Sequence, residues 1–434
     1  MTKLSDPITL PCGVTLQNRM IKGAMTEGLA DLQNNATDMH VKLYSRWAKS
    51  GAAVLLTGNV QIDRNHLERP GNVVIEEGGA DLEALKAYAA AGTQNGTHLW
   101  MQISNAGRQT PKTVNDNPMA PSAVALDMPV EMSGKPREMT EAEIEDMISR
   151  FAFVSKTAQD TGFTGVQLHA AHGYLLSEFL SPLANKRTDK WGGSLENRAR
   201  FLLEAVKATR AAVGPAFPVA VKLNSSDFQK GGFSMKDCLA VVELLNEAGV
   251  DLLEISGGNY EQPAMMNGEG ELEPEYAEDV KESTKAREGF FLNYARAVKK
   301  VAKMPILVTG GFRSTAGMNA ALAEGGADMI GVGRPFCVEP ELAKDVIAGV
   351  SEGWPRYEQL LRLGPGWLGP ASPINAIRML NILGPQGWYC MQLLGMGGKL
   401  SFGPKKGVLA GMIGYQRHEA QAAKALAAAR ATQS

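Results

Sequence analysis

The sequence of 434 residues predicts an α/β fold, a (β/α)8 TIM barrel with an N-terminal hairpin and a C-terminal extension. Short apolar runs rich in β-branched residues alternate with longer amphipathic runs, and the alternation occurs eight times. Strict alternation of strand and helix predicts a parallel sheet, and eight such units close into a barrel. An open doubly wound sheet is the alternative, but no G-x-G-x-x-G motif follows an early strand.

Each expected element has its own sequence signal. The strands are expected at Arg19–Met25, Ala53–Thr57, His98–Ile103, Gly165–His169, Pro218–Asn224, Asp251–Ser256, Pro305–Thr309 and Asp328–Val332. The helices are expected at Thr37–Ser50, Asp81–Asn95, Thr140–Asp160, Asn197–Val213, Ser234–Ala248, Ala286–Ala302, Ser314–Glu324 and Pro340–Ile347. Thr140 with Glu143 predicts a capping box, and Ser314 is typical of a residue that begins a helix.

Two segments flank the barrel, which we place at residues 1–350. Before the first strand, Ile8–Leu10 and Val14–Leu16 alternate in polarity around a Pro-Cys-Gly turn, which predicts a hairpin that plugs the barrel bottom.

The extension, residues 351–434, has lost the strand–helix rhythm, and we expect it to be mostly helical or irregular, with an Ala-rich helix at His418–Arg430. Its Trp388 and Tyr389 have two interpretations: they pack on the outside of the barrel, or they cap the site of a neighbouring subunit.

Composition narrows the function. Hydrophobic residues are 44% and charged residues 21% of the chain, which is typical of a folded domain. A net charge of −2 gives no overall field for nucleic acid or an anionic membrane. We read no signal peptide and no run of about 18 apolar residues. Four scattered cysteines suit a reducing compartment, so a cytoplasmic location is expected, and a homo-oligomer is left open.

Polar and Gly residues should gather after the strands, because the loops at the C-terminal ends of barrel strands build the active site. The long connections 105–139 and 257–285 also leave these ends and are typical of lids. Gly310 and Gly311 follow strand seven, and Gly333 and Arg334 follow strand eight. Glycine backbone, a helix N-terminus and a guanidinium together predict a phosphate site; tight turns alone are the alternative.

The end of strand four carries His169, His172 and Tyr174. Two imidazoles can hydrogen-bond one oxygen and polarise a carbonyl, and a nearby phenol can donate a proton. A metal site is the rival interpretation, but it lacks a third ligand nearby other than Glu178. A third interpretation gives the histidine pair and the tyrosine packing roles only. Lys222, inside strand five, is expected to contact a buried anion.

The run Gly165–Arg200, GVQLHAAHGYLLSEFLSPLANKRTDKWGGSLENRAR, closely resembles the old yellow enzyme family of FMN-dependent ene reductases. Other loops agree in order along residues 5–345: Ala24-Met25-Thr26, Met101-Gln102-Ile103, Val221-Lys222-Leu223 and Gly331-Val332-Gly333-Arg334.

The resemblance implies a bound FMN and a role for each matching residue. Gly23, Ala24, Met25 and Thr26 would line the flavin ring with Gly58 beside them, Gln102 would bind its pyrimidine end, and Lys222 would face its N1 edge. Gly310, Gly311, Gly333 and Arg334 would hold the phosphate. His169 and His172 would bind the substrate oxygen, and Tyr174 would protonate the α-carbon. Two departures are Lys222, where many members have Arg, and Ala24, where Pro is frequent.

This reading predicts an oxidoreductase that takes hydride from NADH or NADPH and reduces activated C=C bonds in small molecules: enones, enals, maleimides or nitroalkenes. An NAD(P)H oxidase or quinone reductase on the same flavin is one alternative. A non-catalytic flavin-binding barrel is the second. The iron–sulfur branch of the family is disfavoured because the cysteines are not clustered.

Overall fold

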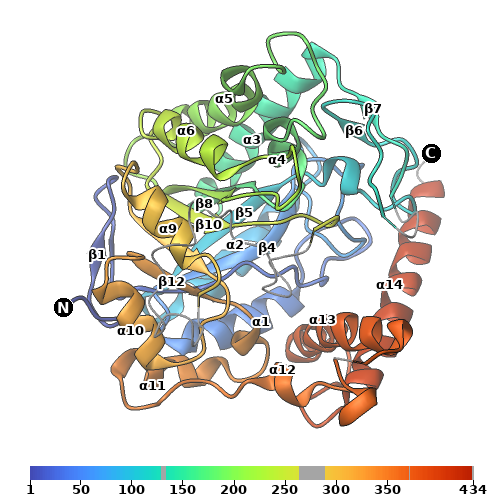
Figure 1. Ribbon diagram of the computed structural model, residues 1–434. Coiled ribbons are helices and arrows are strands. Elements are labelled where there is room, and N and C mark those ends of the chain that lie inside the picture. The colour runs from blue at the N-terminus through green and yellow to red at the C-terminus, as the bar shows by residue number, and fades with distance from the viewer. Residues whose placement is uncertain (129–132, 263–288, 371, 433–434) are drawn as a thin grey trace.

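The computed structural model describes residues 1–128, 133–262, 289–370 and 372–432, and its centre is a closed parallel barrel (Figure 1). The strands follow one another around the barrel as β3, β4, β5, β8, β9, β10, β11 and β12. They span Met20–Lys22, Val54–Gln61, His98–Ser104, Gly165–Ala170, Val219–Asn224, Leu252–Ser256, Ile306–Thr309 and Met329–Val332. All eight predicted strand positions are therefore confirmed, and with them the fold class.

The helices between the strands also follow the prediction. They are α1 Asp38–Trp47, α2 Leu82–Gly92, α3 Glu141–Asp160, α5 Leu195–Val213, α6 Met235–Leu245, α9 Leu292–Lys299, α10 Thr315–Ala323 and α11 Ala343–Ala348. Thr140 accepts a hydrogen bond from the Glu143 backbone N–H and Ser314 one from that of Gly317, so both predicted caps are confirmed.

The two long connections are described in part. Connection 105–139 contributes a two-stranded sheet of β6, Met119–Ala120, and β7, Arg137–Glu138, and a short α4, Leu175–Leu180, follows β8. Residues 129–132 of this connection and residues 263–285 of connection 257–285 lie outside the described residues, as does the start of the helix expected at Ala286–Ala302.

The N-terminal hairpin closes the bottom of the barrel, as predicted. Its strands β1, Ile8–Thr9, and β2, Thr15–Leu16, pair antiparallel. Leu10 and Leu16 pack into one buried cluster with side chains from the early parts of the barrel strands, among them Trp100. Burial of this cluster stabilises the barrel from below at about 25 cal/mol per Å² of apolar surface removed from water.

The extension is more helical than the sequence indicates. It contains α12, Tyr357–Leu360, α13, Asn375–Gly397, and α14, Val408–Ala431. No helix is predicted at α13, which holds Pro385 in its interior, and α14 begins ten residues before the helix expected at His418. The extension lies on the side of the barrel opposite the hairpin (Figure 1).

The two long helices of the extension cross closely. A Cβ atom on Gly411 would lie 2.6 Å from the Trp388 Cα, so glycine is what permits this approach. The Trp388 indole donates a hydrogen bond of 2.6 Å to the Lys406 carbonyl, which fixes the turn between the helices. The extension is thus a packed helical pair rather than a loose tail.

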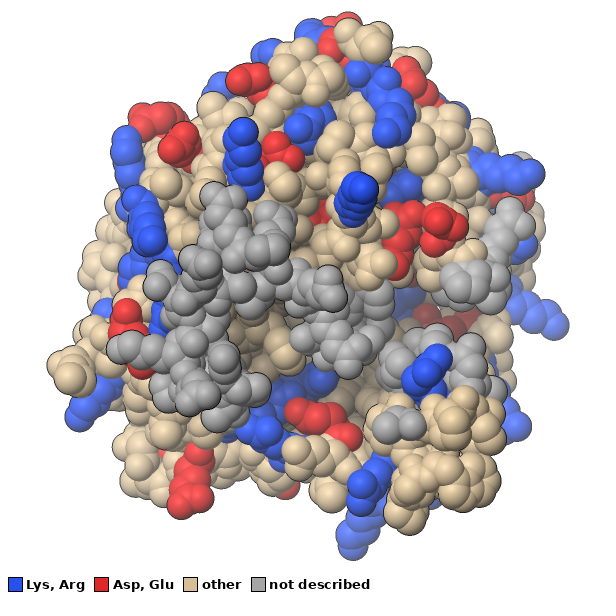
Figure 2. Space-filling model, in the orientation of Figure 1, with Lys and Arg blue, Asp and Glu red and all other residues tan. Residues whose placement is uncertain are grey.

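The surface agrees with the near-zero net charge. Basic and acidic side chains are interspersed over the face shown in Figure 2, which gives that face no field of one sign. Among the described helices, none has the length and apolar composition needed to cross a bilayer.

Candidate active site

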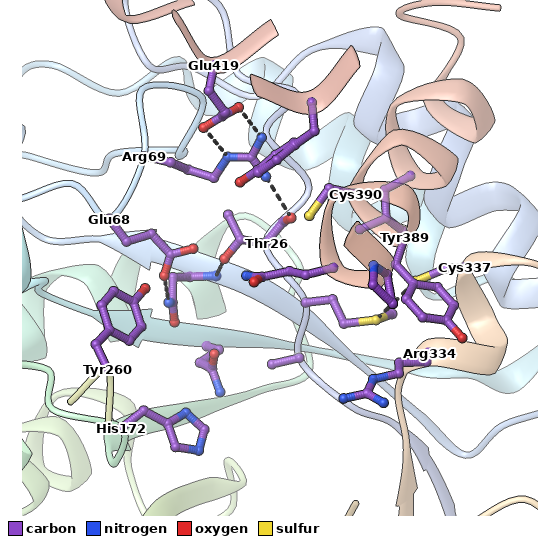
Figure 3. A pocket seen from close by; sticks show the side chains of 18 of the residues that line it. Thr26, Glu68, Arg69, His172, Tyr260, Arg334, Cys337, Tyr389, Cys390 and Glu419 are labelled. Carbon is purple, nitrogen blue, oxygen red and sulfur yellow. Dashed lines mark hydrogen bonds and ion pairs between the residues drawn. The ribbon is translucent and has the colours of Figure 1, made fainter. Parts of the chain in front are cut away.

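A cavity of about 730 Å³ opens at the C-terminal ends of the barrel strands (Figure 3). Nine of the residues predicted for the site line it: Ala24, Met25, Thr26, Gln102, His169, His172, Tyr174, Lys222 and Arg334. These side chains come from the ends of five strands that are far apart in the sequence. The barrel therefore brings them to one mouth, as the parallel arrangement of strands requires.

The five predicted glycines are not among the residues that line the cavity. Three of them, Gly23, Gly58 and Gly333, lie next to lining residues and permit close packing of the backbone there. A Cβ on Gly58 would lie 2.5 Å from the Thr26 Cα, so only glycine lets β4 approach the loop after β3. A Cβ on Gly23 would contact Thr309, and one on Gly333 would contact Met25. Gly310 and Gly311 have φ angles of +125° and +84°, which favour glycine strongly.

Lys222 contacts a buried anion, as predicted, and the anion is Glu254. The two side chains form an ion pair of 3.0 Å. Gln167 donates to the other oxygen of Glu254 at 2.8 Å, and Gln102 donates to Gln167 at 2.7 Å. This row of hydrogen bonds below the cavity fixes the positions of Gln102 and Lys222, so both reach the cavity in defined orientations.

Hydrogen bonds determine which ring nitrogens of the histidine pair carry protons. Asn59 donates from Nδ2 to the Glu68 carboxylate, which can only accept, so Asn59 Oδ1 faces His169. His169 Nδ1 therefore donates to Asn59 Oδ1 at 3.1 Å. Burial, together with the charge of Lys222, lowers the pKa of both imidazoles well below the usual value, so both rings are neutral.

The remaining nitrogens follow from this neutral state. His169 Nε2 has no proton and accepts from His172 Nδ1 at 3.2 Å. His172 Nε2 then accepts from the Ser256 hydroxyl at 2.6 Å. The N–H group between the two rings thus belongs to His172.

Tyr174 lies beside the histidine pair, with its ring centroid 4.7 Å from that of His169. Its hydroxyl donates to Glu68 at 2.8 Å and therefore accepts from the Tyr260 hydroxyl at 2.9 Å. Burial, the negative charge of Glu68 and the contact with Tyr260 raise the pKa of Tyr174 well above its ordinary value. Tyr174 is consequently protonated at neutral pH, as a proton donor must be.

The sequence reasoning missed several groups that line the cavity. Asn59 follows the second predicted strand, which was a usable signal. Glu68 and Arg69 come from a loop and had no signal, whereas Tyr260 lies in connection 257–285, which the sequence marks as typical of a lid. The extension adds further lining residues: Glu358, Pro370, Arg378, Asn381, Pro385, Gln386, Tyr389, Cys390, Leu393, Tyr415 and Glu419.

Neither interpretation of Tyr389 was right. It lines the cavity of its own chain, and therefore neither packs on the barrel's outside nor is needed to reach a neighbouring subunit. Trp388, the next residue back, packs between α13 and α14.

The residues present fit a flat, anionic cofactor. Ala24, Met25 and Thr26 line the cavity together with the cations Lys222 and Arg334, and Arg334 lies close to Tyr389 in Figure 3. Gly58 and Gly333 pack against Met25 and Thr26, where an added Cβ would contact these residues. The donor set suits a ring that gains negative charge near Lys222 and carries a phosphate near Arg334.

The family model described as the NADH:flavin oxidoreductase / NADH oxidase family matches residues 3–352 of the chain. The chain belongs to this family, that of the old yellow enzymes. Its members use FMN with NADH or NADPH as reductant, and this chain is an oxidoreductase of that kind. The alternative of a non-catalytic flavin-binding barrel is therefore wrong.

Particular relatives of this oxidoreductase agree. An NADH-dependent flavin oxidoreductase, iliE, of Neonectria sp. is 39% identical over 361 residues, which cover 79% of this chain and 46% of that protein. The chain thus spans about half the length of this relative. A structure of 2-naphthoyl-CoA reductase matches with a TM-score of 0.72 at 30% identity, over 80% of this chain and 52% of that one. An old yellow enzyme homologue from Zymomonas mobilis shares the fold, with a TM-score of 0.67 at 23% identity over 84% and 97% of the two chains.

Proposed function

We propose that this oxidoreductase reduces activated C=C bonds of small molecules, with Tyr174 as the proton donor. The observation that carries the proposal is the position of the Tyr174 ring beside His169, in a cavity that His172, Thr26, Gln102 and Lys222 also line. Reduction of an enone needs a group that polarises the carbonyl and an acid near the α-carbon, and these residues provide both.

When bound, FMN would supply the chemistry of hydride transfer from NADH or NADPH to the β-carbon of the acceptor. The chain's own residues orient the cofactor, bind the substrate and supply the proton. Gln102 and Lys222 orient the cofactor, and Lys222 offsets negative charge at its edge. Gly310, Gly311, Gly333 and Arg334 are the residues that would hold its phosphate.

The histidine pair would bind the carbonyl oxygen. His172 Nδ1–H, which donates to His169 in the substrate-free protein, turns to the substrate oxygen and polarises the carbonyl. A second donor from His169 requires a proton on its Nε2, which means release of the Nδ1 proton now held against Asn59. Asn59 thus decides whether the pair offers one hydrogen bond or two.

Proton transfer completes the reaction. The Tyr174 O–H bond breaks as a C–H bond forms at the α-carbon, and the Tyr260 hydroxyl, already donating to Tyr174, returns a proton to the tyrosinate. Tyr260 is partly exposed and takes a proton from water in turn. The sequence of transfers leaves each residue in its starting protonation state.

The test is Tyr174→Phe in the FMN-loaded enzyme, studied in separate half-reactions. Loss of a general acid should slow reoxidation by 2-cyclohexenone by about 100-fold or more, while reduction by NADH changes less than about threefold. Tyr357→Phe, a half-buried tyrosine outside the cavity, is the matched control and should leave both steps unchanged.

The alternative named by the family, an NADH oxidase or quinone reductase, gives a different result. Electron transfer to oxygen or to menadione needs no proton at a carbon, so Tyr174→Phe would leave these rates intact in either case. A wild-type enzyme that reduces menadione but no enone, enal, maleimide or nitroalkene would refute the proposed alkene reduction.

A further inference from the structure

The outer wall of the cavity belongs to the C-terminal extension, beyond the segment matched by the family model. From α14, Glu419 faces the barrel loop that carries Glu68 and Arg69 (Figure 3), and the Tyr415 ring lies beside Arg69. The chemistry of this part of the cavity is therefore set jointly by barrel and extension, because Arg69 of the barrel loop pairs with Glu419 of α14.

Arg69 is held by Glu419 on two sides of its guanidinium. Its Nε donates to Glu419 Oε2 at 3.1 Å, and its NH2 group donates to Oε1. A third nitrogen faces the Thr26 carbonyl at 3.4 Å, and the guanidinium lies 5.2 Å from the centre of the Tyr415 ring. The Arg69 side chain is only 7% exposed, so this arrangement commits its donors to groups of the protein.

Glu419 is ionised at neutral pH. Burial alone would raise its pKa, but the charge of Arg69 and hydrogen bonds from His418 and Arg69 outweigh burial and lower the pKa to about 2. The positive charge of Arg69 is therefore offset by Glu419, and Glu68 adds a second carboxylate to this part of the cavity.

An anionic substrate group would lose its hydration here without gaining a cation to pair with. An uncharged, planar group loses little hydration and gains contact with the rings of Tyr260 and Tyr415. We propose that Glu419 is a specificity-determining residue: by neutralising Arg69 it makes the site select uncharged, planar unsaturated carbonyl compounds over unsaturated carboxylates. This inference rests on the alkene reduction proposed above.

The test compares two ligands with one carbon skeleton, cinnamate and cinnamamide, which differ in charge. Both are titrated against the oxidised FMN-loaded enzyme without reductant, so that binding is measured through the flavin absorbance and no turnover occurs. The wild type should bind cinnamamide more tightly than cinnamate. Glu419→Gln releases Arg69 to hold the carboxylate in place of the histidine pair, and should tighten cinnamate binding about tenfold or more, the usual gain for a hydrogen bond to a charged group. Cinnamamide, whose carbonyl stays with the histidine pair, should change little.

Two further variants keep the test decisive if Glu419→Gln loosens α14. Arg69→Gln leaves Glu419 without its cation and should weaken cinnamate binding about tenfold or more, in the opposite direction. Glu419→Asp keeps the charge and should preserve the preference for cinnamamide. The proposal is overturned if the wild type prefers cinnamate, or if neither Glu419→Gln nor Arg69→Gln moves cinnamate binding in its expected direction.

Reduction of cinnamaldehyde by the NADH-reduced wild type separates the two proposals. Its absence would count against the proposed alkene reduction, whereas the binding series judges the role of Glu419 by itself.

Discussion

At the scale of single residues, Glu68 connects the residues that we propose take part in catalysis. Its carboxylate accepts one hydrogen bond from Tyr174 and one from Asn59, and Asn59 in turn fixes the tautomer of His169. Glu68 thus accepts a hydrogen bond from the Tyr174 hydroxyl. Through the Asn59 amide it also fixes which nitrogen of His169 carries the proton. We infer that Glu68 is a positioning residue, because its two contacts act through other groups.

Glu68→Gln tests this role through the pH dependence of the reaction. The variant keeps an oxygen that accepts from Tyr174 but removes the negative charge that raises the pKa of Tyr174. The alkaline limb of the enone-dependent reoxidation rate, where Tyr174 loses its proton, should therefore move to lower pH by roughly one unit or more. The rate of reduction by NADH serves as the internal control. An equal loss in both half-reactions with no shift in the pH profile would assign Glu68 a purely structural role.

At the scale of elements, the sequence predicts the repeating strands and helices. It does not predict the features that depend on tertiary contacts. The ends of five strands carry the nine predicted residues that line the cavity, because period and composition locate a strand end to within a few residues. The end of β4 is less regular: its pairing with β5 shifts between Leu56 and Asn59, which turns Asn59 toward the mouth. The position of Asn59 after the predicted strand is a usable signal, but a local pattern does not reveal the shift in strand pairing.

The helix α13 shows the same limit more strongly. Proline inside a helix costs about 3 kcal/mol, so Pro385 argues against a helix on local grounds. Packing against α14 and the barrel, with Trp388, Leu393 and Leu394 buried, overrides that local preference. Glu68, Arg69 and Glu419 are beyond prediction for a related reason, since their roles exist only once a barrel loop and α14 meet.

Gly411→Leu should separate α14 from α13. The added side chain would collide with the Trp388 backbone, and overpacking of this kind costs about 1–3 kcal/mol. We expect faster hydrogen exchange along α14 and weaker cinnamamide binding, with the FMN content retained because Lys222 and Arg334 lie on the barrel. Gly403→Leu, whose added side chain meets open space, is the matched control. Unchanged exchange in α14 would show that the crossing tolerates bulk.

At the scale of the whole molecule, the barrel is closed at both ends by segments outside its repeating units. The hairpin fills the bottom with apolar side chains, and the extension covers the mouth with polar and aromatic ones. The hairpin contributes to the stability of the barrel, and the extension contributes residues to the cavity. The ring of strands itself is completed by β3, a strand of three residues that pairs with both β12 and β4.

Lys22, the last residue of β3, makes the stability of the whole fold depend on pH. It is fully buried, donates to the Leu56 carbonyl at 2.5 Å and lies 4.2 Å from the Trp47 ring centre. Burial lowers its pKa to about 8, although the Glu27 carboxylate acts in the opposite direction. Between pH 8 and its ordinary pKa near 10.5, the unfolded chain binds the proton more readily than the folded one, so this residue's contribution to the unfolding free energy rises with pH.

Lys22→Met removes that dependence. The unfolding free energy of the wild type minus that of the variant, from urea unfolding at pH 7, 8, 9 and 10, should therefore increase by on the order of 2 kcal/mol across the series. Taking the difference cancels the titration of every group that the two proteins share. Lys86→Met, at an exposed position on α2, should give a difference that stays flat with pH. A flat difference for Lys22→Met as well would mean that the buried ammonium keeps its ordinary proton affinity, and that the hydrogen bond and the ring contact at the β3 seam offset its burial in full.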